Sequence, residues 1–199
     1  RGTVSLDGQA VTPLSIFNAD PKWIVAATAE SKLMVIRNGE LQIAHASEPF
    51  AAAITALSGE LTGGKIAVLL ADGTVRVLTI APDTGIVTDA AEIKSDAGAI
   101  EKISGHGSVL LTVAGKRTVQ NWKVEDASQV NRFDLPADIT ELDLNSATDR
   151  GVFSLADNTA SLWSLNEPKQ IAVLTADLDA QRRLKYAEQT KAIFDARVN

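Results

Sequence analysis

Short apolar runs recur along the chain and are separated by polar clusters rich in Gly, Asp, Asn and Ser. Runs such as "WIVAAT", "KIAVLL" and "SVLLTV" are almost uniformly apolar, which is typical of strands that are covered on both faces. The stretch "ADGTVRVL" (Ala71–Leu78) places Asp-Gly between two apolar runs, which predicts a tight hairpin turn with a positive φ at Gly73. This pattern predicts an all-β fold over most of the chain.

The same pattern occurs four times when the copies are aligned on the apolar residue that closes the run after the tight turn. That residue is Ile36, Leu78, Trp122 and Trp163 in the successive copies, and the steps between them are 42, 44 and 41 residues. A mostly extended unit of about 40–45 residues is the span of one four-stranded propeller blade. We therefore predict a domain over residues 1–174 with four blades, at approximately 11–46, 51–90, 97–134 and 138–174.

Each predicted blade begins with one strand, continues with a buried second strand and a third strand after the short turn, and ends with a more polar strand at the outer edge. The first strands are predicted at Thr12–Phe17, Ala53–Leu57, Ala99–Ile103 and Ile139–Leu144, and the second at Trp23–Thr28, Lys65–Leu70, Ser108–Val113 and Gly151–Leu155. The third strands are predicted at Leu33–Arg37, Thr74–Ile80, Thr118–Val124 and Thr159–Leu165, and the fourth at Glu40–Ala44, Ile86–Asp89, Gln129–Phe133 and Gln170–Leu174.

Two of these units resemble WD40 repeats: "AAAITALSGELTGGKIAVLLADGTVRVLTI" (Ala51–Ile80) and "DITELDLNSATDRGVFSLADNTASLWSL" (Asp138–Leu165). The resemblance covers roughly Val11–Leu174 and implies propeller blades, with Asp72 and Asp157 in the turn where the family keeps an Asp. The chain departs from the family at the Asp that normally follows the Trp and at the Gly-His pair that opens a repeat. The family's buried His–Asp–Ser–Trp hydrogen-bond network is therefore expected to be incomplete.

Four blades of this kind amount to about half of a usual WD40 ring, because such rings are generally larger than four blades. A blade needs a neighbour on each side to bury its faces, so the first and last blades are expected to leave one face open. A second chain, a second copy or a further segment would cover these faces, and a self-closed four-bladed ring is the alternative.

Residues 175–199 have a different composition, without Gly or Pro and rich in Ala, Leu, Lys, Arg, Glu and Gln, which favours a helix. Apolar side chains at heptad-like spacing form a predicted seam for a partner helix, and a helix lying on the propeller surface is the alternative. The seam residues are Leu184, Ala187, Phe194 and Val198. WD40 proteins in some bacteria look similar, with a long helical insertion between two sets of blades.

The chain is acidic, with a formal net charge of -6 over 199 residues, which argues against binding nucleic acid or an anionic membrane through bulk charge. No apolar run approaches the ~20 residues that a membrane-spanning helix needs. The chain contains no Cys, so disulfides and thiolate metal sites are excluded.

The residue types that carry chemistry do not form a recognisable catalytic pattern. His45 and His106 lie far apart without other ligands at metal-binding spacing, so no metal site is expected. Asp72 and Asp157 are equivalent turn residues, for which a turn-stabilising role is expected rather than acid–base catalysis. The glycines of "LTGGK" (Leu61–Lys65) lack the spacing of a phosphate loop and predict a turn, and the basic cluster "QRRLK" (Gln181–Lys185) predicts a solvated helix face.

The sequence therefore predicts a non-enzymatic scaffold for protein–protein interaction, without a cofactor, that binds through loops at one end of the blades. The predicted loops are Asn18–Lys22, Ser58–Gly64, Ser104–Gly107 and Asn145–Arg150. The alternative is a propeller domain within a larger redox enzyme that positions a catalytic or cofactor-binding domain, an expectation that depends on architecture alone.

Overall fold

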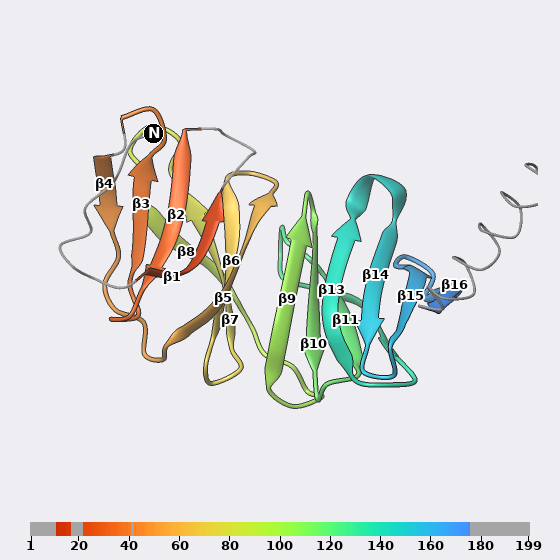
Figure 1. Ribbon diagram of the computed structural model, residues 1–199. Helices are drawn as coiled ribbons and strands as arrows, with labels where there is room; N and C mark the ends of the chain where they lie inside the picture. Colours follow the sequence, from red (N-terminus) through yellow and green to blue (C-terminus); the bar gives the residue numbers. More distant parts are fainter. Residues whose placement is uncertain (1–10, 17–21, 41, 176–199) are drawn as a thin grey trace, which may run out of the picture.

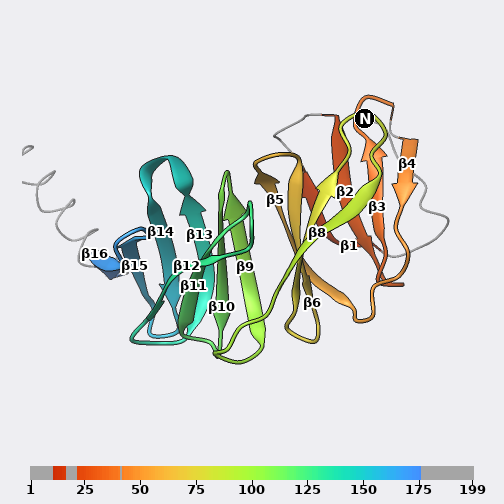
Figure 2. The same ribbon diagram turned by 180° about the vertical axis from the view of Figure 1, so that it is seen from behind.

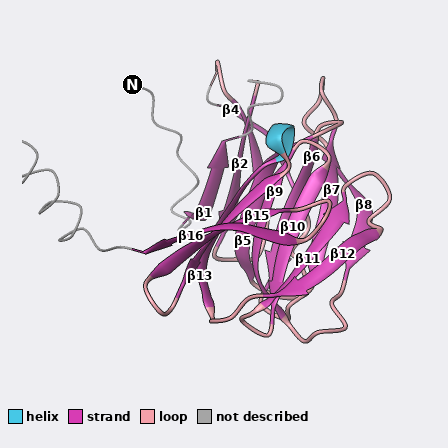
Figure 3. Cartoon of the chain, turned by 90° about the vertical axis from the view of Figure 1, so that its right-hand side faces the viewer, coloured by secondary structure: helices cyan, strands magenta, loops and turns pink. Residues whose placement is uncertain are grey.

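The structure, a computed structural model, describes residues 11–16, 22–40 and 42–175. These residues form four antiparallel sheets of four strands each. Within the described ranges the helical content is one 3₁₀ turn, Ser146–Thr148, shown in cyan in Figure 3. The predicted all-β fold with four sheets is thus confirmed, and the helix predicted over residues 175–199 lies outside the described residues, apart from Thr175 at the end of a strand.

In every sheet the strands lie side by side in sequence order, so each sheet is a four-stranded meander. Sheet 1 contains β1 (Val11–Ile16), β2 (Trp23–Thr28), β3 (Leu33–Arg37) and β4 (Gln42–Ala46); sheet 2 contains β5 (Ile54–Leu61), β6 (Lys65–Leu70), β7 (Val75–Ile80) and β8 (Val87–Ile93). Sheet 3 contains β9 (Ile100–His106), β10 (Val109–Ala114), β11 (Thr118–Lys123) and β12 (Gln129–Asp134); sheet 4 contains β13 (Ile139–Asn145), β14 (Arg150–Leu155), β15 (Thr159–Ser164) and β16 (Lys169–Thr175).

The Asp-Gly turn joins β6 and β7 as the apolar pattern predicts. Gly73 has φ +80°, and the Leu70 carbonyl accepts a hydrogen bond from the Gly73 amide at 3.0 Å. A Cβ at this glycine would lie 2.7 Å from the Cβ of Ala99, at the start of the next sheet. Gly73 therefore serves both the turn and the close approach of sheet 3.

The sheets form a row in which the first strand of each contacts the first strand of the next, in the order β1, β5, β9, β13. In Figures 1 and 2 the row is open, because sheets 1 and 4 lie at its opposite ends. Three hydrophobic cores fill the spaces between successive sheets. We call the face of a sheet that meets the preceding sheet its leading face, and the face that meets the following sheet its trailing face.

Two of the four predicted loops are largely strand. Ser58–Leu61 belongs to β5 and Ser104–His106 belongs to β9, so the connections that remain are the short turns at 62–64 and 107–108. These two strands are extended because they contact each other: Ser58 Oγ accepts a hydrogen bond from the Gly105 amide at 2.7 Å, and the Thr62 amide donates to the Gly107 carbonyl at 2.8 Å. The Ser-Gly pairs that favour loops in the sequence allow this close packing instead.

Of the other predicted loops, Asn145–Arg150 contains the 3₁₀ turn, with Asn145 and Arg150 themselves at strand ends. The loop Asn18–Lys22 lies outside the described residues except for Lys22.

Candidate interaction site

The four residues on which the repeats align occupy one position in the structure. Each lies opposite the second residue of its sheet's second strand, and each coincides with an irregularity in pairing to the fourth strand. The pairs are Ile36 with Ile24, Leu78 with Ile66, Trp122 with Leu110, and Trp163 with Gly151. The steps of 42, 44 and 41 residues therefore reflect a shared backbone register, including a shared β-bulge.

The two tryptophans at this position differ in their surroundings. Trp122 is 8% exposed, and its indole Nε1 donates a buried hydrogen bond to Thr112 Oγ1 at 2.9 Å. Trp163 is only half-buried; it stacks on Phe133 of sheet 3, with the ring centroids 4.8 Å apart, and its buried Nε1 has no partner. Phe153 stands where sheet 3 has Thr112, so no acceptor is present.

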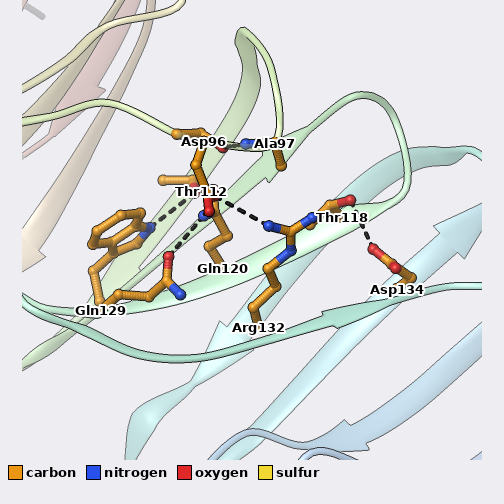
Figure 4. A network of polar contacts seen from close by, with 10 residues as sticks. Asp96, Ala97, Thr112, Thr118, Gln120, Gln129, Arg132 and Asp134 are labelled. Carbon is orange, nitrogen blue, oxygen red and sulfur yellow. Dashed lines mark hydrogen bonds and ion pairs between the residues drawn. The ribbon is translucent and has the colours of Figure 1, made fainter.

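Next to Trp122, a polar network links sheet 3 to the segment that precedes it (Figure 4). The fully buried Gln120 donates from Nε2 to Gln129 Oε1 at 2.7 Å and to Asp96 Oδ1 at 3.2 Å. Arg132 Nη1 donates to the same Asp96 oxygen at 3.1 Å. The network holds the connection between sheets 2 and 3 against the leading face of sheet 3, which is a structural role.

Asp72 and Asp157 lie in corresponding turns and accept hydrogen bonds from the residue two positions later. Asp72 Oδ1 accepts from the Thr74 amide at 2.9 Å, and Asp157 Oδ1 accepts from the hydroxyl and amide of Thr159 at 2.7 and 3.0 Å. The Thr159 hydroxyl, followed by its amide, lowers the pKa of Asp157 from its ordinary value of 3.8. This geometry is that of a turn-stabilising Asx motif.

A hollow of about 560 Å³ lies between β4 with its following loop and the outer part of sheet 2. Arg76 is its central cation, and it pairs with Asp89 at 2.6 Å and Glu92 at 3.7 Å. Glu92 also pairs with Lys94 at 2.6 Å. Two cations and two carboxylates of this groove are thus paired with one another, and Glu48 and Asp72 add two further carboxylates to its lining. His45 also lines the groove, and the described residues contain no metal-binding cluster.

The trailing face of sheet 4 is the largest departure from the packing of the other sheets. In sheets 1 to 3 the third residue of the second strand is buried against the following sheet: Val25, Ala67 and Leu111 are 1%, 0% and 0% exposed. The equivalent residue of sheet 4, Val152, is 42% exposed, and Leu174 on the same face is 61% exposed. The cross-strand pairs of Val152 with Leu162 and of Leu174 with Ala160 place all four residues on one face, in two neighbouring rows across β14, β15 and β16.

Two hollows flank this apolar surface of sheet 4. One, of about 430 Å³, is lined by Ser154, Asn158, Ala160 and Leu174 among others. The second, of about 330 Å³, is lined by Arg150, Ser164, Glu167, Lys169, Gln170 and Ile171. An apolar centre between polar ends is the usual anatomy of a protein-binding surface.

At the opposite end of the row, the leading face of sheet 1 is less exposed than the sequence predicts. On the leading face of sheet 1, Ala26 and Ile36 are 1% and 4% exposed, and Ile24 and Met34 are half-buried. These positions of sheet 1 are thus buried, whereas the trailing face of sheet 4 is exposed. Residues 1–7, which the sequence offers as a possible cover for the first sheet, lie outside the described residues. Among the described residues, the trailing face of sheet 4 therefore combines an exposed apolar surface with the lack of a neighbouring sheet.

The seam residues Leu184, Ala187, Phe194 and Val198 lie outside the described residues, so the predicted helix pairing stays a prediction. The basic cluster Gln181–Lys185 lies there too. Over the part of the chain that the structure covers, no helix is long and apolar enough to cross a membrane. Neither a protein-family model nor a curated protein matches this chain.

Proposed function

We propose that this chain is a non-enzymatic scaffold for protein–protein interaction, built from four WD40-like blades of a partial propeller that another segment or chain completes. The shared register of the four sheets and the contact of their first strands around one side support the assignment of the sheets as blades. The polar clusters of the described residues serve turns and the contacts between sheets, as the networks of Asp157 and Gln120 illustrate.

The observation that carries the proposal is the exposed trailing face of sheet 4. Val152 and Leu174 are 42% and 61% exposed, on a face whose central residues in the other three sheets, Val25, Ala67 and Leu111, are buried. Covering such side chains is favourable by about 1.5–3 kcal/mol for each Val or Leu that passes from full exposure to full burial. A contiguous apolar surface of this kind marks an interaction site in a folded protein.

The test is sedimentation velocity of the 199-residue chain over a range of micromolar concentrations, together with binding of a dye that reports exposed apolar surface. We expect Val152→Lys to reduce both association and dye binding. Val130→Lys is the matched control, because Val130 is 43% exposed, close to the 42% of Val152, but lies on the outer strand of sheet 3. A compact monomer that binds no more dye than the Val152→Lys variant would overturn the proposal.

A further inference from the structure

We propose that the occupant of the trailing face of sheet 4 is a fifth four-stranded antiparallel sheet with the repeat pattern of this chain, docked by its own leading face. This inference rests on the proposed function and specifies the partner. The three internal interfaces of the row provide the pattern, because each joins a trailing face to a leading face in the same register.

The apolar centre of each internal interface comes from equivalent positions. Sheet 3 contributes Leu111, Val113 and Val119, which pack against Phe153 and Leu155 on the leading face of sheet 4. The positions of sheet 4 that correspond to these three trailing residues hold Val152, Ser154 and Ala160, and each is smaller than its equivalent in sheet 3. Ser154 and Ala160 line the hollow of about 430 Å³. The partner sheet is therefore expected to present a large aliphatic or aromatic side chain at this point.

A polar contact at one end also recurs in two of the three internal interfaces. Lys65, the first residue of β6, donates from Nζ to the Val124 and Glu125 carbonyls of sheet 3 at 3.0 and 3.2 Å. In the next interface, Asn131 Nδ2 donates to the Leu165 carbonyl at 2.5 Å. Val124 and Leu165 both stand two residues after the aligned tryptophan of their sheet, so one carbonyl position receives a side-chain donor from the preceding sheet each time.

Sheet 4 carries a cationic donor at the position that Lys65 occupies in sheet 2. Arg150 is the first residue of β14, as Lys65 is of β6, and it is exposed at the edge of the hollow of about 330 Å³. A fifth sheet in the same register would bring its own carbonyl, two residues after its aligned apolar residue, to the Arg150 guanidinium.

A backbone contact recurs as well. The Gly73 carbonyl in the β6–β7 turn accepts from the Ile100 amide at 3.3 Å, and the Lys116 carbonyl in the β10–β11 turn accepts from the Ile139 amide at 2.8 Å. In each case the donor is the first residue of the following sheet. Asn158, with φ 64°, occupies the corresponding turn of sheet 4 and lines the hollow there. The first amide of a fifth sheet would meet this turn.

The number of residues in one repeat can be compared with the number that follow sheet 4 in this sequence. The fourth sheet with the connection before it takes the 41 residues 135–175, whereas the 24 residues 176–199 are too few for four strands of this size. These 24 residues alone therefore do not provide a complete further sheet.

The experiment places such a sheet next to sheet 4 within the full chain. A second copy of residues 135–175 is inserted after Thr175, so that β16 is followed by the same connection that follows β12. The chain has no Cys, and Val152→Cys therefore provides a single thiol reporter on the docking face. We expect the insertion to slow thiol labelling by about tenfold or more, because labelling then requires the docked sheet to open.

The matched control is the same insertion with the Phe153 and Leu155 positions of the copy changed to Lys, which should restore fast labelling. Ala160→Cys is a second reporter, and a copy of residues 94–134 is a second insertion for use where the first fails to fold. Equal labelling with and without either insertion would overturn the fifth-sheet proposal while leaving the scaffold proposal to its own dye and sedimentation test. Slow labelling in the chain without an insertion would show that its own residues cover the face and would overturn both.

Discussion

Replacing Trp122 and Trp163 separately by Phe should destabilise the chain by different amounts, although the two residues occupy the same repeat position. Trp122→Phe removes the donor of the 2.9 Å hydrogen bond to Thr112 Oγ1 and leaves this fully buried hydroxyl without its partner. Trp163→Phe removes an indole N–H that has no partner in the native structure and keeps an aromatic ring on Phe133.

The magnitude follows from the cost of orphaning a buried polar group, which is about 1–3 kcal/mol beyond the loss of packing. Both substitutions remove a similar side-chain volume, so the packing energy that they lose is similar. It differs only because Trp122 is buried and Trp163 is half-buried. We therefore expect Trp122→Phe to lower the free energy of unfolding by about 1–3 kcal/mol more than Trp163→Phe. The absent acceptor at Phe153 is the physical cause of the difference.

The assay is urea denaturation followed by circular dichroism, with equal m-values required because chains of stacked units can unfold in parts. Thr112→Val, alone and with Trp122→Phe, completes a double-mutant cycle whose coupling should be about 0.5–1.5 kcal/mol. Equal losses for the two Trp variants, or no coupling between Trp122 and Thr112, would refute the hydrogen-bond argument.

Three further predictions concern the core, a turn and acid stability. Phe153→Ala, at a residue with 0% exposure between sheets 3 and 4, should lower the free energy of unfolding in the same assay by about 3–5 kcal/mol. Gly73→Ala should destabilise more than Gly63→Ala in matched melts: both have positive φ, but a Cβ lies within 2.7 Å of the next sheet at Gly73 and meets nothing within 4 Å at Gly63. Because the pKa of Asp157 is lowered in the folded state from 3.8, its stabilising contribution is present above that pH and is lost as the pH falls through the lowered value. Asp157→Asn, which keeps an acceptor for Thr159, should therefore make the urea midpoint fall less on acidification, and an unchanged acid dependence would contradict this.

The sequence predicted the elements whose pattern is local. The second and third strands follow from near-continuous apolar runs around a short turn, and the residues that align the repeats follow from their spacing, because one backbone register recurs. The extensions of β5 and β9 could not be predicted in the same way. Ser58 and Gly105 are typical of loops, and they are extended only because two strands from different sheets meet there.

The sequence predicted that a sheet at the end of the row would expose an apolar face, but it did not predict which end. An incomplete ring predicts an open face at each end, yet Ala26 and Ile36 are buried at one end while Val152 is exposed at the other. No pattern in the sequence distinguishes Val152 from Leu111, since both are apolar residues in equivalent strands. The difference arises from what lies next to each sheet, which is a property of the assembled row.

The internal interfaces also explain how four sheets share one architecture although the side chains that join them differ. The features that recur in all four sheets are of the backbone: the strand order and the bulge at the aligned residue. The side-chain bonds differ from one interface to the next, with Lys65 donating in one and Asn131 in another to the corresponding carbonyl. A backbone carbonyl accepts a hydrogen bond from any donor that reaches it, so this contact tolerates substitution of the donor. The Trp122–Thr112 hydrogen bond needs two specific side chains, and it is present in sheet 3 but not in sheet 4. The sheets therefore dock through a shared backbone register, even though the side chains that donate to the carbonyl differ. For this reason the repeat is visible in the sequence mainly as a regular spacing.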